Sequence, residues 1–181
     1  MVQKPQILGA KTVAKTRIFQ VEQLDLKFSN GVEVSYERMR SSGNGAVLIV
    51  PLLDAETVLL TREYAAGVHR YELALPKGKI ETDEDILLAA DREMMEEVGY
   101  GAKNLTLISS LTVSPGYMDH VTHVVLAEDL YPKKCEGDEP EEIEVMPWRL
   151  DQLNELLLHE ECTEARSIAA LFMVRERLLN R

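Results

Sequence analysis

Residues 1–44 carry an alternation of polar and apolar positions that predicts β-strands. The segment 12–28 alternates between apolar and polar side chains, and the segment 32–40 alternates again after Ser-Asn-Gly at residues 29–31. A strand places successive side chains on opposite faces, and Asn-Gly is a strong hairpin signal. Residues 41–45, Ser-Ser-Gly-Asn-Gly, then break the alternation. The sequence therefore predicts an N-terminal β-hairpin element that is set apart from the rest of the chain.

Residues 45–181 mix apolar runs of strand length with stretches of helical period. Strands are expected at residues 46–53, 57–64, 69–78, 105–117, 121–131 and 143–150. Helices are expected at residues 85–98, 150–159 and 163–179. For the first helix, Thr82 and Asp85 predict a capping box at the start, and Gly99 predicts the end. Many strands and few helices in mixed order predict an α+β domain in which helices enclose a sheet.

The helix predicted at residues 85–98 has an acidic side next to its apolar side. Glu93 and Glu97 are four residues apart, so their side chains share one face, and Glu96 flanks them. Like charges at this spacing cost an exposed helix roughly 0.2–0.5 kcal/mol. A hard divalent cation, Mg²⁺ or Mn²⁺, prefers oxygen ligands and would reverse that cost while binding substrate phosphates. For a lone pair of glutamates, a solvated acidic face is the alternative.

The overall charge and the cysteine content exclude some classes of partner. The formal net charge is −11, which disfavours binding to a nucleic acid polymer or to an anionic membrane surface. No apolar run approaches the roughly 18 residues of a membrane span. Cys135 and Cys162 do not form a CxxC pair and fit a reducing cytoplasm, with a single disulfide left open. We therefore expect a cytoplasmic protein that does not bind membranes.

The acidic helix belongs to a longer spaced pattern, G-x5-E-x7-R-E-x-x-E-E-x-G. Its fixed positions are met by Gly78, Glu84, Arg92, Glu93, Glu96, Glu97 and Gly99. This pattern resembles the Nudix box, the signature of the Nudix hydrolases. Two positions that are usually aliphatic in the box hold Met94 and Tyr100. The resemblance implies an α/β/α sandwich around a mixed sheet and a metal-dependent hydrolysis of diphosphates.

The Nudix resemblance also implies a role for each matching residue. Glu93 and Glu97 would be the main metal ligands, and the backbone carbonyl of Lys77 would add a further contact. Glu96 would bind a further metal or position the attacking water. The structural residues of the motif, of which the middle two would form an ion pair, would be Gly78, Glu84, Arg92 and Gly99.

Two segments outside the box indicate the branch of the family. The Ser-Pro-Gly-Tyr segment at residues 114–117 is typical of the ADP-ribose pyrophosphatase branch, although Pro-Gly alone is also a common turn. Ser114 and Tyr117 would then contact substrate. The segment 136–144 holds six acidic residues, and in this branch such a loop supplies a glutamate that acts as the base or completes the metal site. Glu139 and Glu141 match that position, with a solvated loop as the alternative.

The resemblance to this branch, and within it to bacterial hydrolases of ADP compounds, covers nearly the whole chain. The resemblance is seen in four segments: "VAKTRIF", "SNGVEVSYERMR", "LYPKKCEGDEPE" and "EARSIAALF". It implies a homodimer in which the strands of residues 1–44 are exchanged between subunits and bind adenosine through Arg38, with Phe19 a weaker candidate. Residues 63–65 read Glu-Tyr-Ala where many relatives have Gln-Tyr-Arg. This departure suggests a different or broader substrate choice, with Arg62 and Glu72 facing the cleft.

The sequence as a whole thus predicts a Mg²⁺- or Mn²⁺-dependent pyrophosphatase. Its substrate would be an adenine dinucleotide or an ADP-sugar: ADP-ribose, NADH or a diadenosine polyphosphate, with AMP as one product. Two alternatives stay open at this stage. One is another Nudix activity, on nucleoside triphosphates or sugar nucleotides. The other is a catalytically silent domain that senses a nucleotide.

Overall fold

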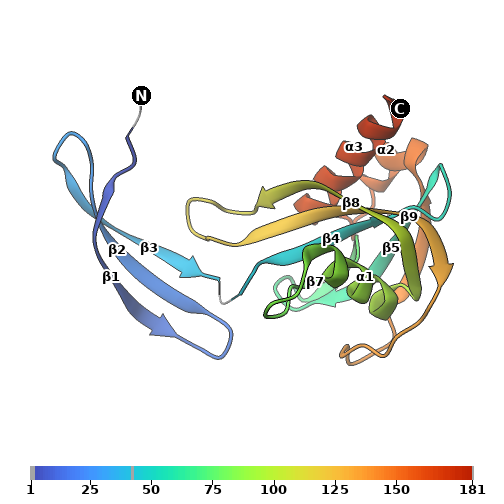
Figure 1. Ribbon diagram of the computed structural model, residues 1–181, viewed down its shortest axis with the longest axis horizontal. Coiled ribbons are helices and arrows are strands. Elements are labelled where there is room, and N and C mark those ends of the chain that lie inside the picture. Colours follow the sequence, from blue (N-terminus) through green and yellow to red (C-terminus); the bar gives the residue numbers. More distant parts are fainter. Residues whose placement is uncertain (1–2, 42, 181) are drawn as a thin grey trace.

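The computed structural model describes residues 3–41 and 43–180, and its first three strands form a sheet of their own. These strands are β1 (Gln6–Lys15), β2 (Gln20–Lys27) and β3 (Glu33–Arg40). They pair antiparallel in the order β1-β2-β3 and project away from the rest of the molecule (Figure 1). The predicted hairpin is present as β2 and β3, and β1 adds a third strand.

The extra strand arises from a turn that the alternation does not reveal. The backbone N–H of Thr16 donates to the carbonyl of Phe19 at 2.8 Å, and the Thr16 hydroxyl accepts from the Phe19 N–H at 2.9 Å. These two local bonds reverse the chain inside the segment 12–28, which we expected to run straight. The turn contains neither Gly nor Pro, so the pattern gave no signal for it.

Two further sheets form the centre of the molecule. The first has the order β7-β4-β9-β8, in which β4 and β9 run parallel while the other pairs are antiparallel. The second has the order β10-β5-β6 and is antiparallel throughout. The strands are β4 (Ala46–Pro51), β5 (Thr57–Ala65), β6 (Arg70–Ala74), β7 (Lys77–Lys79), β8 (Tyr100–Thr112), β9 (Val121–Pro132) and β10 (Glu144–Arg149).

Helices cover both faces of the central sheets, as the α/β/α sandwich prediction requires (Figure 1). Strand β4 is buried on both faces: Val47 and Ile49 pack with α1, whereas Leu48 and Val50 pack with the apolar face of α3. The continuous apolar run that predicted this strand is explained by that double coverage. The helical elements are α1 (Ile86–Glu97), the 3₁₀ turn η1 (Leu150–Gln152), α2 (Leu153–Leu156) and α3 (Ala165–Leu179). Within the described residues, no helix is long and apolar enough to cross a membrane.

Several predicted boundaries differ from the structure for local reasons. The strand expected at 105–117 is β8, which begins earlier, at Tyr100, and ends at Thr112 because the residues after it form a turn closed on the carbonyl of Ser114. Asp85 is the N-cap of α1, and its carboxylate accepts from the N–H groups of Leu87 and Leu88 at 2.8 and 3.3 Å. The predicted capping box from Thr82 is therefore wrong, because the aspartate caps the helix by itself. The strand expected at 69–78 divides into β6 and β7, which lie in different sheets on either side of Pro76. The helix expected at 150–159 is shorter, consisting of η1 and α2.

The N-terminal sheet meets the centre of the molecule at the connection between β8 and β9. The Met39 N–H donates to the carbonyl of Tyr117 at 2.7 Å, and the carbonyl of Met39 accepts from Asp119 at 3.4 Å. Arg40 adds an ion pair to the Asp119 carboxylate at 3.5 Å. The segment predicted as a substrate contact, residues 114–117, thus lies at the junction of the two parts.

Candidate active site

The acidic side of α1 is buried rather than solvated. Glu97 is 3% exposed and Glu93 is 8% exposed. The Glu97 carboxylate accepts a hydrogen bond from the Lys77 N–H at 3.1 Å, which joins the helix to β7. Burial raises the pKa of Glu97 to about 8, although the charge of Lys77 opposes the shift. The alternative of a solvated acidic face is therefore wrong for Glu93 and Glu97.

Glu93 lies directly against the strand that precedes the helix. A Cβ atom placed on Gly78 would lie 1.9 Å from Cδ of Glu93. No side chain fits in that space, so the glycine allows β7 to approach the carboxylate. Burial is the main cause of the raised pKa of Glu93; Arg92 opposes it, and the negative charges of Glu96 and Glu139 add to it.

A bidentate ion pair joins α1 to the loop that precedes it. Arg92 Nε and Nη2 donate to the two carboxylate oxygens of Glu84 at 2.8 and 3.0 Å. Arg92 Nη2 also donates to the carbonyl of Lys79 at 3.0 Å. These bonds span the turn between β7 and the helix. At the other end, Gly99 has a φ of 81°, which a left-handed helix cap needs. The ion pair predicted between Glu84 and Arg92 is thus present in the structure.

The same arginine compensates part of the buried negative charge. Arg92 Nη1 donates to Glu93 at 2.8 Å and to Glu96 at 3.2 Å. In this arrangement the described residues contain no group of three His, Cys, Asp or Glu side chains already placed to hold a metal. The donor set nevertheless fits a hard divalent cation, because Glu93, Glu96 and Glu97 offer carboxylate oxygens close together at a largely buried position. Such a cation would supply the positive charge that Arg92 supplies only in part.

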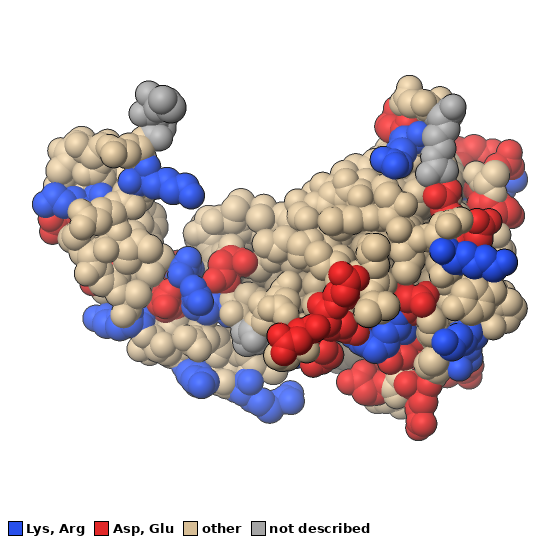
Figure 2. Space-filling model, in the orientation of Figure 1, with Lys and Arg blue, Asp and Glu red and all other residues tan. Residues whose placement is uncertain are grey.

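The acidic loop, residues 133–143, lies along the end of α1. Lys134 Nζ donates to the carbonyl of Glu96 at 2.7 Å, and the Cys135 N–H donates to the carbonyl of Met95 at 3.1 Å. Further along, a Cβ on Gly137 would lie 3.5 Å from Cβ of Glu96. The loop borders a hollow of about 390 Å³ that Glu96 also lines. Figure 2 shows acidic side chains gathered over this face of the molecule.

The two loop glutamates that were predicted as candidate bases have different surroundings. Glu139 lies on the side of α1: a Cβ atom placed on Gly137 would meet Oε2 of Glu139 and would lie 3.5 Å from Cβ of Glu96. The negative charge of Glu139 also adds to the raised pKa of Glu93, after the larger effects of burial, Arg92 and Glu96. Glu141 accepts a hydrogen bond from the Tyr71 hydroxyl at 2.7 Å. The structure therefore brings Glu139 toward the box and Glu141 toward the β5–β6 hairpin.

The substrate-binding candidates on the β5–β6 hairpin are already held by protein groups. Arg62 donates twice to Glu161, at 2.8 and 2.7 Å. Glu72 accepts from Arg70 at 2.6 Å and from the Thr163 N–H at 3.2 Å. Both side chains thus tie this hairpin to the segment before α3. Arg62 also forms an ion pair with Glu144 at 3.7 Å, so both side chains already have protein partners.

The remaining substrate candidates gather at the junction with the N-terminal sheet. Arg38 and Tyr117 line one hollow of about 390 Å³, and Arg38 is paired with Glu22 at 2.8 Å. The carbonyl of Ser114 accepts from the Tyr117 N–H at 2.9 Å, which makes the predicted turn. Phe19 lines a separate hollow of about 180 Å³. Within one chain this junction lies apart from α1 (Figure 1), so the structure does not bring these residues to the box glutamates.

Sequence reasoning missed two contacts of the site. Tyr71 grips the acidic loop, and Lys77 Nζ forms an ion pair with Glu63 at 2.6 Å. Neither contact has a local signal in the sequence, because the partners lie 70 and 14 residues apart along the chain.

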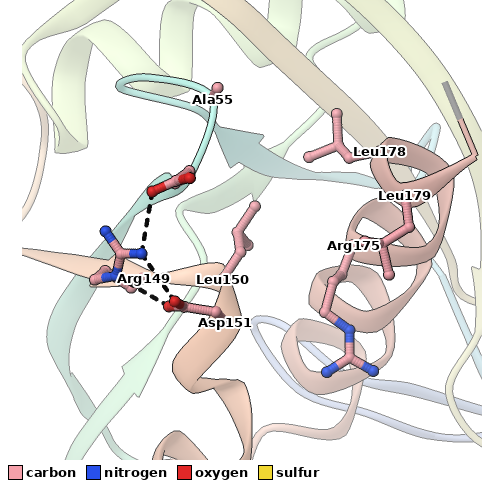
Figure 3. Close-up of a pocket in the computed structure, with 8 residues that line it drawn as sticks. Ala55, Arg149, Leu150, Asp151, Arg175, Leu178 and Leu179 are labelled. Carbon is pink, nitrogen blue, oxygen red and sulfur yellow. Dashed lines mark hydrogen bonds and ion pairs between the residues drawn. The ribbon is translucent and has the colours of Figure 1, made fainter.

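A hollow of about 460 Å³ elsewhere on the molecule is lined mainly by leucines and paired charges, without the clustered glutamates of the box. It lies between α3 and the strand that ends at Arg149 (Figure 3). Arg149 pairs there with Asp151 at 2.8 Å and with Glu56 at 3.0 Å, so its charge is already balanced. Leucines supply most of the remaining wall: Leu150, Leu178 and Leu179.

Comparison with protein-family models identifies the class of protein. A model of the NUDIX domain matches residues 44–172, and a model of the NudE-type Nudix hydrolase N-terminal domain matches residues 5–38. The chain belongs to the Nudix hydrolase family, whose members are generally dependent on divalent metals. The box residues described above therefore lie in the part of the chain that defines the family.

Individual relatives share both parts of the chain. It is 48% identical to the ADP compounds hydrolase NudE of Escherichia coli (strain K12), over 97% of this chain and 94% of the relative. It is 33% identical to an ADP-ribose pyrophosphatase of Bacillus subtilis (strain 168), over 91% of each chain. A crystal structure of an ADP compounds hydrolase superposes with a TM-score of 0.92 at 47% identity, covering 99% of this chain and 97% of the other.

Proposed function

We propose that this Nudix hydrolase is a pyrophosphatase that uses Mg²⁺, or Mn²⁺, to cleave ADP-linked compounds into AMP and a phosphorylated partner. The observation that carries the proposal is the pair of buried glutamates, Glu93 and Glu97, next to an acidic loop. Relatives that match the chain over most of its length are an ADP compounds hydrolase and an ADP-ribose pyrophosphatase, and this supports the choice of substrate.

The residues of the box would divide the chemical work among them. When bound, the metal supplies positive charge beside the two phosphates and makes water easier to deprotonate. Glu93, Glu96 and Glu97 hold that charge in place, and Lys77 offers its backbone carbonyl. Arg92 keeps the helix fixed to the preceding loop through Glu84.

A water molecule then attacks one phosphorus in line with the leaving phosphate oxygen. Its proton passes to a carboxylate of the acidic loop, and the P–O bond of the anhydride breaks toward the leaving phosphate. Glu139 is our choice for this base because its carboxylate lies beside Gly137, which in turn lies against Glu96 of α1.

We further propose a homodimer in which residues 1–44 of one subunit complete the site of the other. The N-terminal sheet supports this, because its large apolar side chains are open to solvent in the single chain. Those at least 39% exposed include Ile7, Leu8, Val13, Val32, Val34 and Tyr36. A second copy would cover them, and its Arg38 would reach substrate there. Light scattering tests this: the wild-type protein should have twice the mass of one chain, and Tyr36→Asp should give a monomer.

The first experiment on function is a substrate panel. ADP-ribose, NADH, diadenosine triphosphate, GDP-mannose and dATP are each incubated with the protein and Mg²⁺, and the products are separated by chromatography. We expect AMP from the first three and no product after addition of a chelator. Release of product from GDP-mannose or dATP alone would instead indicate another Nudix activity. A shift in melting temperature with ADP-ribose but no product would indicate a silent sensor.

The location of the protein in the cell is part of the same proposal. Cys135 and Cys162 are both free thiols. We propose a cytoplasmic location because free thiols are normal in that reducing compartment.

A further inference from the structure

The β5–β6 hairpin holds the acidic loop by a hydrogen bond that the proposed mechanism has not used. The phenol oxygen of Tyr71 donates to Oε1 of Glu141 at 2.7 Å, a normal length for a bond to a carboxylate. Tyr71 lies on β6, and Glu141 lies in the middle of the loop, 70 residues later. The bond therefore joins a strand of the central sheet to a segment without regular structure.

Tyr71 is itself held in place from more than one side. The guanidinium of Arg62 lies 4.6 Å from the centre of the Tyr71 ring, and Arg62 is fixed by its bidentate bond to Glu161. The ring of Tyr64, opposite in the sheet, meets the Tyr71 ring edge-on with centroids 5.9 Å apart. A ring fixed in this way presents its hydroxyl at one place, because only the C–O torsion remains free.

The loop needs an anchor because it carries the same sign of charge as the surface it lies on. Residues 136–144 contain six acidic side chains, and the loop lies along the helix that carries Glu93, Glu96 and Glu97. Its start is fixed by the Cys135 N–H bond to Met95, and its end by the buried side chain of Ile143. Between these ends, like charges push the loop away from α1. A phenol donates a hydrogen bond without adding charge, and its contact with Glu141 raises the pKa of Tyr71, so it stays protonated at neutral pH.

We propose that Tyr71 is a positioning residue that fixes the acidic loop by holding Glu141 on the hairpin. The loop then presents Glu139, and not Glu141, to the box. The assignment of Glu139 as the base rests on the proposed function, whereas the anchoring of the loop by Tyr71 does not. The proposal separates two neighbouring glutamates that the sequence alone could not distinguish.

Limited proteolysis of the metal-free, full-length protein tests the anchor without any catalysis. A loop that is held against the protein is cut more slowly than one that moves freely, so the rate at which a glutamate-specific endoprotease cuts within residues 136–142 reports how firmly the loop is held. Tyr71→Phe keeps the ring packing and loses the hydroxyl. We expect it to be cut in the loop roughly three- to tenfold faster than wild type, as the loss of an exposed hydrogen bond to a charged group predicts. Tyr64→Phe, which keeps its ring and loses a hydroxyl that contacts His69, is the matched control and should be cut at the wild-type rate. Equal rates for wild type and Tyr71→Phe would overturn the proposal.

A double-mutant cycle on the active enzyme tests whether the two residues act through one bond. Tyr71→Phe and Glu141→Ala should each lower kcat several-fold while KM stays within about twofold, since neither residue needs to touch substrate. The double variant should lose no more than the larger single loss. Glu142→Ala is the neighbouring control and should retain the wild-type kcat. Multiplying losses in the double variant, or a far larger loss for Glu141→Ala alone, would show Glu141 acting directly and would refute the proposal. If wild type released no AMP in the substrate panel, the proposed function would fail while the proteolysis result still stood.

Discussion

Glu97→Gln removes a carboxylate that the fold holds at 3% exposure. Burial raises the pKa of Glu97 from an ordinary 4.5 to about 8. Below pH 4.5 the group is protonated in both the folded and the unfolded chain, so it has no effect on stability. As the pH rises from 4.5 toward 8, the unfolded chain releases the proton while the folded protein retains it. The free energy of unfolding therefore falls through this interval, and above it the loss is complete.

The size of the effect follows from the distance between the two pKa values. At pH 7 the solution is 2.5 pH units above the ordinary pKa of 4.5 and still below the folded-state pKa of about 8. Each pH unit in this interval lowers the free energy of unfolding by about 1.4 kcal/mol, so the metal-free protein loses about 3 kcal/mol of stability. Glutamine has the same shape and can still accept the bond from the Lys77 N–H. Glu97→Gln should therefore stabilise the metal-free protein by about 3 kcal/mol at pH 7, which corresponds to a rise in Tm of about 6–12 °C for a chain of this size.

The assay is thermal unfolding in chelator and in Mg²⁺, at several pH values between 5 and 8. In chelator the Tm of wild type should fall with rising pH more steeply than that of Glu97→Gln. In Mg²⁺ the wild-type protein should regain stability because the metal binds the folded state, whereas the variant should gain little. Hydrolysis by the variant should fall by several orders of magnitude. Glu160→Gln, an exposed glutamate, is the control and should match wild type. Equal Tm values for wild type and Glu97→Gln in chelator across this range would refute the reasoning.

Two further substitutions test how the box is built. Gly78→Ala puts a methyl group 1.9 Å from Cδ of Glu93, so we expect a loss of about 1–3 kcal/mol in stability and a strong fall in kcat/KM, whereas Gly67→Ala, with nothing within 4 Å, should change neither. Wild-type kinetics for Gly78→Ala would show that Glu93 is free to move away without consequence. Arg92→Lys keeps the charge but loses the bidentate bond to Glu84, so unfolding experiments should show a loss of about 1–2 kcal/mol. An unchanged Tm for this variant would mean that the ion pair does not hold the loop to the helix.

Much of the fold could be predicted because each pattern has one physical cause. The apolar run of β4 predicted a strand buried on both faces, and the structure places helices on both sides of it. Gly99 predicted the end of α1 and has the positive φ that such an end needs. The turn at residues 16–19 could not be predicted, because it is made by hydrogen bonds of Thr16 that leave the alternation unbroken.

The candidate site also has one part that the sequence predicts and another that it does not. The spacing of Glu93 and Glu97 already fixes that they share one face of a helix, and burial follows once that face packs against β7. The contact between Tyr71 and Glu141 spans 70 residues, and the one between Arg62 and Glu161 spans 99. Partners so far apart are chosen by the packing of whole elements, which no local pattern records. The roles of these residues in binding and catalysis stay predictions.

The N-terminal sheet buries almost no apolar surface by itself, and the specific activity of the enzyme should therefore depend on its concentration. Among residues 3–41, only Leu24 is buried, at 9% exposure. A three-stranded sheet needs a covered apolar face to be stable by itself, and one buried leucine does not provide it. In the proposed homodimer the second subunit would provide that cover, so dilution would loosen the sheet before it affected the central domain. In a dilution series, the specific activity should then decrease once the protein concentration drops below a threshold. Addition of an inactive variant, such as Glu97→Gln, should restore the activity by forming mixed dimers.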